Sequence, residues 1–411
     1  MEQVSYIIYI ESGIVKALNG TTGMVDFSGT NAATVIQMSI DSLIGGIIFI
    51  KKGIYNITKN LTIHQGIIIE GEGEQSTILS LIYNNNFNGL TLTGGTKWTI
   101  LRDLEIYGNA PVSPIYSTDG IVISGSMVEL NNLYIRNCAR HGINANNFVH
   151  LRMINVYSGF NRTGSGAYLH REIIKNDSCN QIYIEGGNYV ANDLFGIGLK
   201  NTSNTLLEMV NFGQNDQDGG DSGGGLSIIG GSNITVENCY FEGQPYNIYI
   251  RNSNLGIGRN TDANELRIIN SMFNPSTICD IDGTGITGIK ISQCFGNKIR
   301  LSAKEIDYEN SAFKTEDITG TFFKNNVLSN TFSIDSAGLK TVTIPHGLAI
   351  APKIQDCQLT VVQNTAVDDW AYNLLKVTYT DATNVTTKIN VSIASTTMGA
   401  TAKLALRVGN Y

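Results

Sequence analysis

A short phrase of alternating aliphatic residues recurs along the middle of the chain, and it is the feature that most constrains the fold. Its copies begin at Leu104, Leu133, Ile154, Ile182, Leu207, Ile234, Leu266 and Ile289. Alternation with a period of two residues is typical of a β-strand. The starts lie 21 to 32 residues apart, and recurrence at that interval indicates one supersecondary unit stacked many times.

A second phrase lies between the copies of the first. It begins at Gly120, Gly142, Gly166, Gly196, Gly225 and Asn247. Each unit therefore contains at least two short strands separated by Gly- and Asn-rich corners, and no helical period intervenes. One coil cannot bury its own inward Ile and Leu side chains, so coils stack on their neighbours to form a continuous core. These features predict a parallel β-helix of roughly ten or eleven coils.

Composition narrows the classes of partner. Only 15% of the residues are charged, against about 25% in an average domain. The net charge is −7 and no run of Lys and Arg occurs, which excludes nucleic acid as an expected partner. Residues 1–6 show neither a basic nor a long apolar segment, and no run of 18 apolar residues occurs. We therefore expect neither a secretory signal nor membrane insertion.

One helix is expected, near the N-terminus. Residues 30–43 begin with residues that can cap a helix and place Val35, Ile36, Ile40 and Leu43 on one face. A Gly-Gly pair at 45–46 ends the helix. A buried strand, a turn and another strand follow.

The same stretch resembles the opening of pectate-lyase-like proteins. The matching features are Asn-Ala-Ala-Thr-Val-Ile-Gln at 31–37, Gly-Gly at 45–46, an aliphatic strand, and Lys-Gly-x-Tyr-x-Ile at 52–57. The resemblance covers about residues 25–70 by motif and extends to about 320 by repeat pattern. It implies a capping helix over the first coil of a right-handed parallel β-helix. The superfamily includes lyases, hydrolases, epimerases and viral tailspikes, so it does not identify a reaction.

Three parts of the chain follow from these patterns. Residues 1–46 form an N-terminal segment with the capping helix, 47–326 the parallel β-helix, and 327–411 a Thr-rich, alternating part. Five strand candidates in that last part predict an antiparallel β-sandwich. The sequence Thr-Ile-Pro-His-Gly-Leu at 343–348 resembles a turn in phage fibre tips and related lectin-like sandwiches. The predicted fold class is all-β: a right-handed, single-stranded parallel β-helix with an N-terminal capping helix and a C-terminal antiparallel β-sandwich.

Two residue types are expected to have structural roles. The six cysteines contain no Cys-x-x-Cys pair, so we expect buried free thiols in the coil stack, with disulfides as the alternative. They are Cys138, Cys179, Cys239, Cys279, Cys294 and Cys357. Asparagines follow the strand phrases and resemble the asparagine ladder of β-helix corners. They are Asn109, Asn137, Asn188, Asn211, Asn238 and Asn270.

An outward row of tyrosines is the first candidate binding site. Stacking the coils phrase on phrase places Tyr107, Tyr134, Tyr157 and Tyr183 on one face with Arg136. Exposed tyrosines offer an apolar ring and a hydroxyl group, which suit a sugar ring. The alternative is that tyrosine simply favours strands.

Three glutamates form a candidate catalytic group. Glu185, Glu208 and Glu237 lie in successive coils, and the phrase alignment gives neighbours a two-residue offset of roughly 8 Å. Inverting glycosidases use two carboxylates about 6.5–9.5 Å apart. Three solvated glutamates are the alternative interpretation.

An acidic loop is the candidate metal site. Asp216, Asp218 and Asp221 bring carboxylates together, which suits Ca²⁺, although their spacing departs from the EF-hand loop. A solvated turn is the alternative, and no other cofactor is required. His141 and His170 fall near corners, where they either contact a ligand or bond to the backbone.

These patterns together predict a viral tailspike or spike on the virion surface. Its expected partner is a host-surface polysaccharide or glycan receptor, to which it binds. One form of this hypothesis adds cleavage of the bound glycan. Such proteins are generally homotrimers and contact other virion or tail components. The alternatives are an extracellular polysaccharide lyase or glycoside hydrolase without a virion role, and a structural shaft or filament protein.

Overall fold

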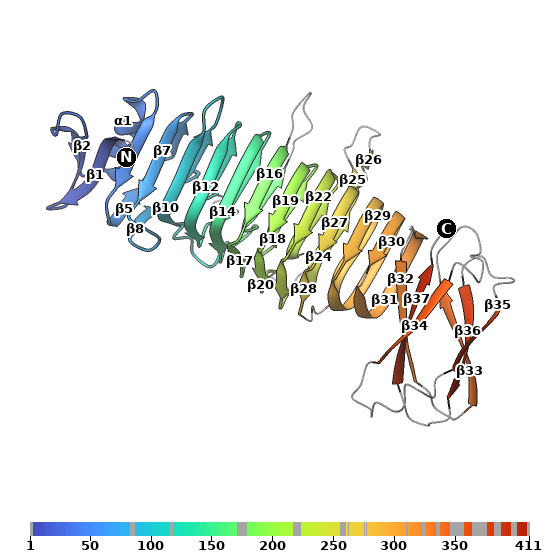
Figure 1. Cartoon of the computed structure of the whole chain (residues 1–411). Helices are drawn as coiled ribbons and strands as arrows, with labels where there is room; N and C mark the ends of the chain where they lie inside the picture. Colours follow the sequence, from blue (N-terminus) through green and yellow to red (C-terminus); the bar gives the residue numbers. More distant parts are fainter. Residues whose placement is uncertain are drawn as a thin grey trace.

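The computed structural model describes most of the chain. The described residues are 3–82, 87–115, 118–170, 179–216, 223–254, 260–261, 263–274, 276, 278–309, 311–322, 326–333, 338–345, 357–363, 376–381, 388–395 and 401–408. They form long rows of strands stacked along one axis, with the single helix α1 beside the first coil (Figure 1). The all-β class and the parallel β-helix are confirmed.

The N-terminal segment is a small antiparallel meander followed by the helix. The meander consists of β1 (Val4–Glu11), β2 (Ile14–Asn19) and β3 (Val25–Gly29). Helix α1 (Ala32–Asp41) begins after Asn31, whose side chain accepts a hydrogen bond from the Thr34 N–H group. It buries Val35, Ile36 and Ile40, as the sequence predicts. Strand β1 also pairs in parallel with the first strand of the β-helix.

The β-helix has three faces, which we name after residues described below. The glutamate face contains β4 (Gly46–Ile50), β7 (Ile67–Gly71), the first halves of β10 (Thr99–Tyr107), β12 (Val128–Arg136) and β14 (Val149–Gly159), then β16 (Asn180–Glu185), β19 (Ser203–Glu208), β22 (Ser232–Glu237), β27 (Asn264–Ile269) and the later parts of β29 (Cys279–Ser292) and β30 (Phe295–Glu309). Each coil thus contributes one strand, or rung, to this face.

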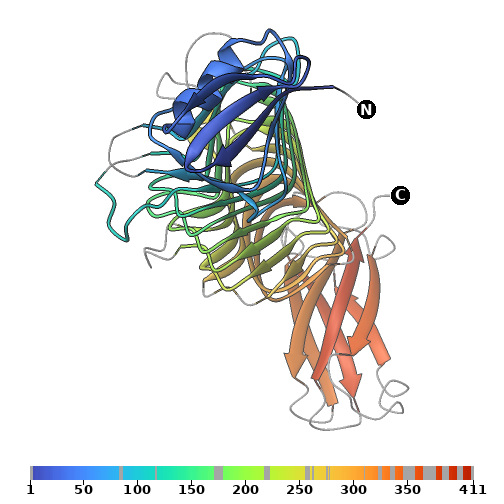
Figure 2. The ribbon, with the colours of Figure 1, turned by 90° about the vertical axis from the view of Figure 1, so that its left-hand side faces the viewer.

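The two other faces are built in the same way. The tyrosine face contains β5 (Gly53–Ile57), β8 (Thr77–Leu81), the second halves of β10, β12 and β14, then β17 (Asn188–Val190), β20 (Asn211–Gly213), β23 (Tyr240–Glu242) and β28 (Met272–Phe273). The histidine face contains β6 (Leu61–His64), β9 (Leu90–Thr93), β11 (Ile121–Ser124), β13 (Ile143–Asn146), β15 (Ala167–His170), β18 (Phe195–Lys200), β21 (Gly224–Ile229), β24 (Tyr246–Arg251) and the first parts of β29 and β30. Figure 2 shows the coils turned by 90°, so that successive turns of the chain overlie one another.

One of the remaining strands extends the stack of coils, and the others form separate antiparallel sheets. Strand β31 (Ala312–Phe322) pairs in parallel with β30, and β25 (Ser253–Asn254) pairs with β26 (Asn260–Thr261) as a short antiparallel ribbon. Beyond them lie two three-stranded antiparallel sheets. One contains β32 (Asn326–Ser333), β37 (Thr401–Val408) and β34 (Cys357–Gln363), and the other β33 (Gly338–Pro345), β36 (Lys388–Ser395) and β35 (Lys376–Asp381). The sandwich and the exact domain limits stay predictions.

The core consists of side chains that meet their equivalents on the next coil. One such row, buried throughout, contains Leu101, Leu130, Met153, Ile184, Leu207, Val236, Ile268 and Ile291. Another is aromatic and contains Tyr189, Phe212, Phe241, Phe273 and Phe313. The rings of Phe212 and Phe241 stack with centroids 4.6 Å apart. Because apolar burial favours folding in proportion to area, these continuous rows stabilise the stack of coils.

Left-handed residues make the corner between the glutamate and tyrosine faces. Asp103, Asn132, Asn155, Asn238 and Asn270 all have φ between 46° and 58° there. Asparagine tolerates this conformation better than most residues. The side-chain amide of Asn270 donates to Asn238 over 2.6 Å. Among the asparagines predicted to form a ladder, that pair and the Asn188–Asn211 pair, 2.9 Å apart, are confirmed.

A second polar ladder lies inside the wall and has no counterpart among the sequence predictions. Its members are at most 2% exposed and are Asn161, Asn192, Asn215, Gln244, Asn247 and Asp280. Each side-chain amide in this buried amide ladder donates to the next member, over 2.7 to 3.2 Å. Since an unpaired buried polar group costs about 1–3 kcal/mol, the ladder favours one register of the coils.

The buried cysteines are free thiols, as predicted. Cys138, Cys179, Cys239, Cys279 and Cys294 are all buried and unbridged. Burial raises the pKa of the Cys279 and Cys294 thiols to about 11, so both stay protonated and unreactive at neutral pH. The side chain of Cys357 lies outside the described residues.

Two buried tyrosines differ in whether the hydroxyl group is bonded, which gives a matched stability test. The Tyr189 hydroxyl is buried without a hydrogen-bond partner, whereas the Tyr55 hydroxyl donates to the Lys51 carbonyl over 2.9 Å. We expect Tyr189→Phe to raise the free energy of unfolding by about 1 kcal/mol and Tyr55→Phe to lower it by about 1 kcal/mol. Urea unfolding of both variants measures this, and equal effects would contradict the assignment.

Candidate functional site

The three candidate glutamates lie side by side on the glutamate face. Glu185 pairs with Glu208, and Glu208 pairs with Glu237, as Cα partners on neighbouring strands. The predicted two-residue offset is therefore wrong: neighbours are one strand spacing apart, about 4.8 Å. That spacing is nearer the roughly 5 Å of retaining glycosidases than the 6.5–9.5 Å of inverting ones. All three side chains are half-buried, and the Tyr183 hydroxyl donates to Glu185 over 2.8 Å.

Four residues of the predicted sugar-binding row form one cluster on the tyrosine face, which we call the tyrosine cluster: Tyr107, Tyr134, Arg136 and Tyr157. Tyr134 and Tyr157 are Cα partners whose ring centroids lie 4.3 Å apart. The guanidinium carbon of Arg136 lies 4.4 Å from the centroid of Tyr107 and 5.6 Å from that of Tyr134. All four side chains are half-buried, so parts of the rings and the guanidinium group meet solvent.

A buried carboxylate fixes the arginine of the tyrosine cluster. The Nε–H group of Arg136 donates to Glu105 over 2.9 Å, and the Glu105 side chain is only 1% exposed. Burial, together with the neighbouring Tyr134, raises the pKa of the Tyr157 hydroxyl. Tyr157 therefore remains a neutral hydrogen-bond donor and acceptor across the physiological range.

Tyr183 does not belong to this cluster, which corrects the prediction. It lies on the glutamate face, paired with Arg152 on one side and Leu206 on the other. The reason is that β14 bends at the left-handed residue Asn155. The phrase beginning at Ile154 therefore straddles the corner, and aligning it with later phrases moves residues to the wrong face.

The predicted metal site is only partly within the described residues. Asp216 is 7% exposed, whereas Asp218 and Asp221 lie outside the described residues. In the part of the chain that the structure describes, no group of three or more His, Cys, Asp and Glu side chains is placed to hold a metal ion. Within those same residues, no helix is long and apolar enough to cross a membrane. Calcium binding stays an untested prediction.

A polar network on the histidine face was not predicted from the sequence. Asp119, which is fully buried, accepts two hydrogen bonds from the Arg140 guanidinium group and one from the side-chain amide of Asn144. The Asn144 oxygen lies 3.0 Å from Nε2 of His170. The His141 N–H group also donates to Asp119. Only the coil register brings these positions together, so no local motif could reveal them.

The two histidines flank a tyrosine within this network. The rings of His141 and Tyr168 have centroids 5.1 Å apart, and those of Tyr168 and His170 4.5 Å apart. The Ser165 N–H group donates to Nδ1 of His141 over 2.9 Å, which places the proton of the neutral ring on Nε2. Burial lowers the pKa of His141 to about 4. Hydrogen bonds and ring contacts thus hold both histidines in the wall of the β-helix.

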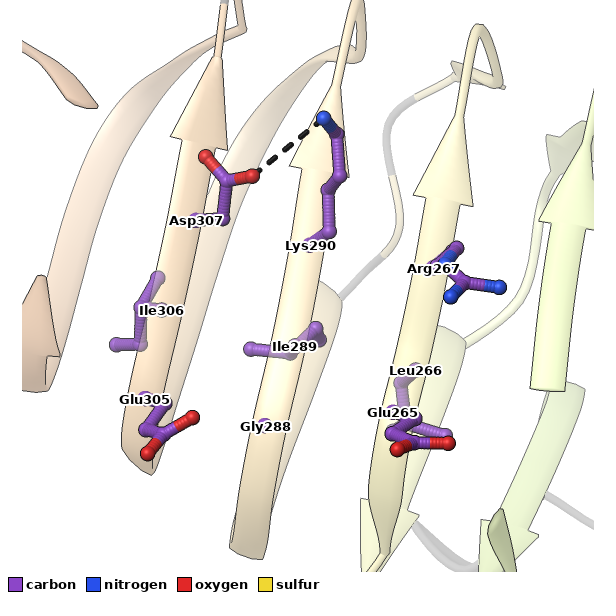
Figure 3. Close-up of a pocket in the computed structure, with 9 residues that line it drawn as sticks. All are labelled: Glu265, Leu266, Arg267, Gly288, Ile289, Lys290, Glu305, Ile306 and Asp307. Carbon is purple, nitrogen blue, oxygen red and sulfur yellow. Dashed lines mark ion pairs between the residues drawn. The ribbon is translucent and has the colours of Figure 1, made fainter. Parts of the chain in front are cut away.

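A shallow depression opens further along the glutamate face (Figure 3). It has a volume of about 270 Å³ and is lined by Glu265, Leu266, Arg267, Gly288, Ile289, Lys290, Glu305, Ile306 and Asp307. Gly288 leaves a gap between Glu265 and Glu305, which lie on the two neighbouring strands (Figure 3). Lys290 forms an ion pair with Asp307 over 3.4 Å. No sequence motif indicates this site, because it consists of a missing side chain in a row of long ones.

Comparisons with known proteins give similarities of architecture. No family model matches the chain, and no curated protein sequence matches it. A Geobacillus virus E2 protein, ORF18, is 14% identical, with 96% of this chain and 82% of that one covered and a TM-score of 0.43. A tailspike protein of Acinetobacter baumannii bacteriophage Fri1, described as a capsular polysaccharide depolymerase, is 11% identical, with coverages of 91% and 81% and a TM-score of 0.46.

An enzyme module is also among the similar structures. The A-module of the mannuronan C-5 epimerase AlgE4 from Azotobacter vinelandii is 17% identical, with 70% of this chain and 93% of that one covered and a TM-score of 0.39. The structural neighbours include phage tailspikes and pectate-lyase-like β-helix enzymes, the group that the opening motif resembles. At these identities and TM-scores the matches carry no inference about reaction or ligand.

The buried His141 predicts a pH-dependent stability. Its folded pKa of about 4 lies below the ordinary value of 6.5, so protonation favours the unfolded chain. Its contribution is complete above pH 6.5 and is lost as the pH falls toward 4, about 3 kcal/mol in all. We expect His141→Gln to flatten the dependence of unfolding free energy on pH in that window, measured by urea unfolding at several pH values.

The exposed His150 provides the control for loss of an imidazole group. His150→Gln is expected to keep the wild-type slope. A His141→Gln variant whose slope also equals that of the wild type would contradict the assignment.

Proposed function

We propose that this protein is a viral tailspike or spike that binds a host-surface polysaccharide. The observation that carries the proposal is the tyrosine cluster, in which three half-exposed tyrosines and an arginine meet on neighbouring rungs of one face. Tyrosine rings pack against the apolar face of a sugar while their hydroxyl groups bond to it. The proposed setting is the virion surface, as a homotrimer attached to other tail components.

The tyrosine cluster is held in place before any ligand arrives. Arg136 is held by the buried Glu105 beneath it and lies close to the rings of Tyr107 and Tyr134. Tyr157 packs on Tyr134. Because side chains that are already ordered lose little rotamer freedom on binding, this arrangement favours recognition of a flexible glycan.

Cleavage of the same polysaccharide is the second candidate function. The observation that favours it is the direct alignment of Glu185, Glu208 and Glu237 on three successive strands. Neighbouring carboxylates at this spacing suit a nucleophile and an acid of the retaining type. Loss of reducing-end release in Glu185→Gln or Glu208→Gln, with binding unchanged, would separate cleavage from attachment.

The tyrosine cluster gives a direct binding test. We expect Tyr134→Ala and Tyr157→Ala each to weaken binding to host-surface polysaccharide about tenfold, because each removes a ring that contacts the sugar. Surface plasmon resonance on immobilised polysaccharide measures the change. Tyr9→Ala, a half-buried tyrosine of the N-terminal meander, is the matched control and should leave the affinity unchanged.

Two results would contradict the proposal. One is a wild-type affinity in both cluster variants while the fold is intact by circular dichroism. The other is a monomer in light scattering at micromolar concentration, which would count against a trimeric spike.

A further inference from the structure

The depression over Gly288 lies on the same face as the row of glutamates, further along the axis of the β-helix. Glu237, the last of the three, pairs with Ile269 of β27, and β27 also contains Glu265 and Arg267. The depression then spans β27, the later part of β29 and the later part of β30. The two features therefore share the glutamate face but lie on different lines: the row of glutamates continues in register to Ile269 and Ser292, four residues along their strands from Glu265 and Gly288.

Gly288 interrupts a row of longer side chains on the glutamate face. Equivalent positions on the preceding rungs follow from the register, because the next residue on each rung is a Cα partner of its neighbour or directly aligned with it. They are His150, Gln181, Asn204, Asn233 and Glu265. On the following rung Gly288 pairs with Glu305. Gly288 differs from the five preceding residues in two ways: it has no side chain, and its φ lies outside the left-handed region in which theirs fall.

No backbone requirement accounts for the glycine. Its φ lies outside the left-handed region, and a Cβ atom would meet nothing closer than Asn264 Oδ1 at 3.7 Å and the Glu265 nitrogen at 3.9 Å. Those are ordinary van der Waals distances, so an alanine could occupy the position without strain. Since glycine weakens the interior of a strand, its presence here points to a use for the empty space.

The depression is lined by both hydrogen-bond donors and hydrogen-bond acceptors. Glu265 and Glu305 are exposed carboxylates on either side of Gly288 (Figure 3). Arg267 is also exposed, two residues after Glu265, and its guanidinium group donates to the Asn233 side-chain oxygen over 3.3 Å. Lys290 and Asp307 neutralise each other in an ion pair. The two carboxylates beside one arginine disfavour an anionic ligand, while hydroxyl groups can donate to the carboxylates and accept from the guanidinium group.

We propose that the depression over Gly288 binds one uncharged sugar residue of a glycan that extends along the glutamate face. This inference rests on the proposed function, glycan attachment, and adds a second subsite and a class of sugar to it. The sugar ring occupies the place of the missing side chain, between Glu265 and Glu305. Arg267 bonds to the sugar from the neighbouring position on β27.

Filling the gap tests the proposal. Saturation-transfer NMR on the full chain would use methyl glycosides of glucose, galactose, mannose and N-acetylglucosamine as uncharged probes, and glucuronic acid as an anionic one. We expect at least one uncharged probe to bind, and glucuronic acid to bind more weakly. These variants are measured in a Tyr134→Ala background, which removes the contribution of the tyrosine cluster. There Gly288→Ala should weaken binding less than threefold, whereas Gly288→Leu should abolish the signal and Glu305→Gln should weaken it about tenfold.

Other outcomes would overturn the subsite. They are no signal from any uncharged probe, stronger binding of glucuronic acid, or a full signal in a folded Gly288→Leu variant. Tyr134→Ala, measured in the same way and on intact polysaccharide, separates the two proposals. Loss of polysaccharide binding in Tyr134→Ala with an unchanged Gly288→Leu variant would leave attachment standing and remove the subsite. The reverse pattern would support the subsite and contradict the tyrosine cluster.

Discussion

Hydrogen bonds between buried side-chain amides on successive coils are the constraint on which the rest of this structure depends. Backbone bonds between parallel strands would form in more than one register, whereas Asn161, Asn192 and Asn215 meet only when the coils are aligned as observed. These side chains are almost fully buried. A slip would leave several amides unpaired, at about 1–3 kcal/mol each. Cooperation between linked bonds in a dry environment adds to this preference.

Register in turn decides which side chains meet on the outer wall. A two-residue shift between β12 and β14 would separate Tyr134 from Tyr157, and one between β16 and β19 would separate Glu185 from Glu208. The continuous apolar rows resist such a shift, because each inward residue packs on its equivalent in the next coil. The wall is therefore a rigid support on which polar and aromatic groups are placed by alignment. Such rigidity favours recognition of an extended chain, since few groups must be ordered on binding.

The sequence was sufficient for the architecture but not for the site. Period-two phrases at a fixed interval predict stacked strands whatever the details of each corner, and the cap of α1 at Asn31 is a local signal. Alignment across coils is different, because the bend of β14 at Asn155 places one phrase on two faces. The sequence pattern predicts the four members of the tyrosine cluster together but wrongly adds Tyr183, and it predicts the row of glutamates with the wrong offset. The depression over Gly288 is formed by residues of three strands around a glycine, so no local sequence motif predicts it.

Disulfide trapping tests the register of the wall most directly. A disulfide needs Cα atoms about 4.4–6.8 Å apart, which neighbouring in-register residues satisfy, and the described native cysteines are buried. The structure predicts that the double variant Glu185→Cys/Glu208→Cys forms a disulfide rapidly under mild oxidation, while Tyr183→Cys/Glu208→Cys does not. Rapid closure of the second pair and not the first would show a two-residue slip and contradict the alignment on which both proposed binding sites depend.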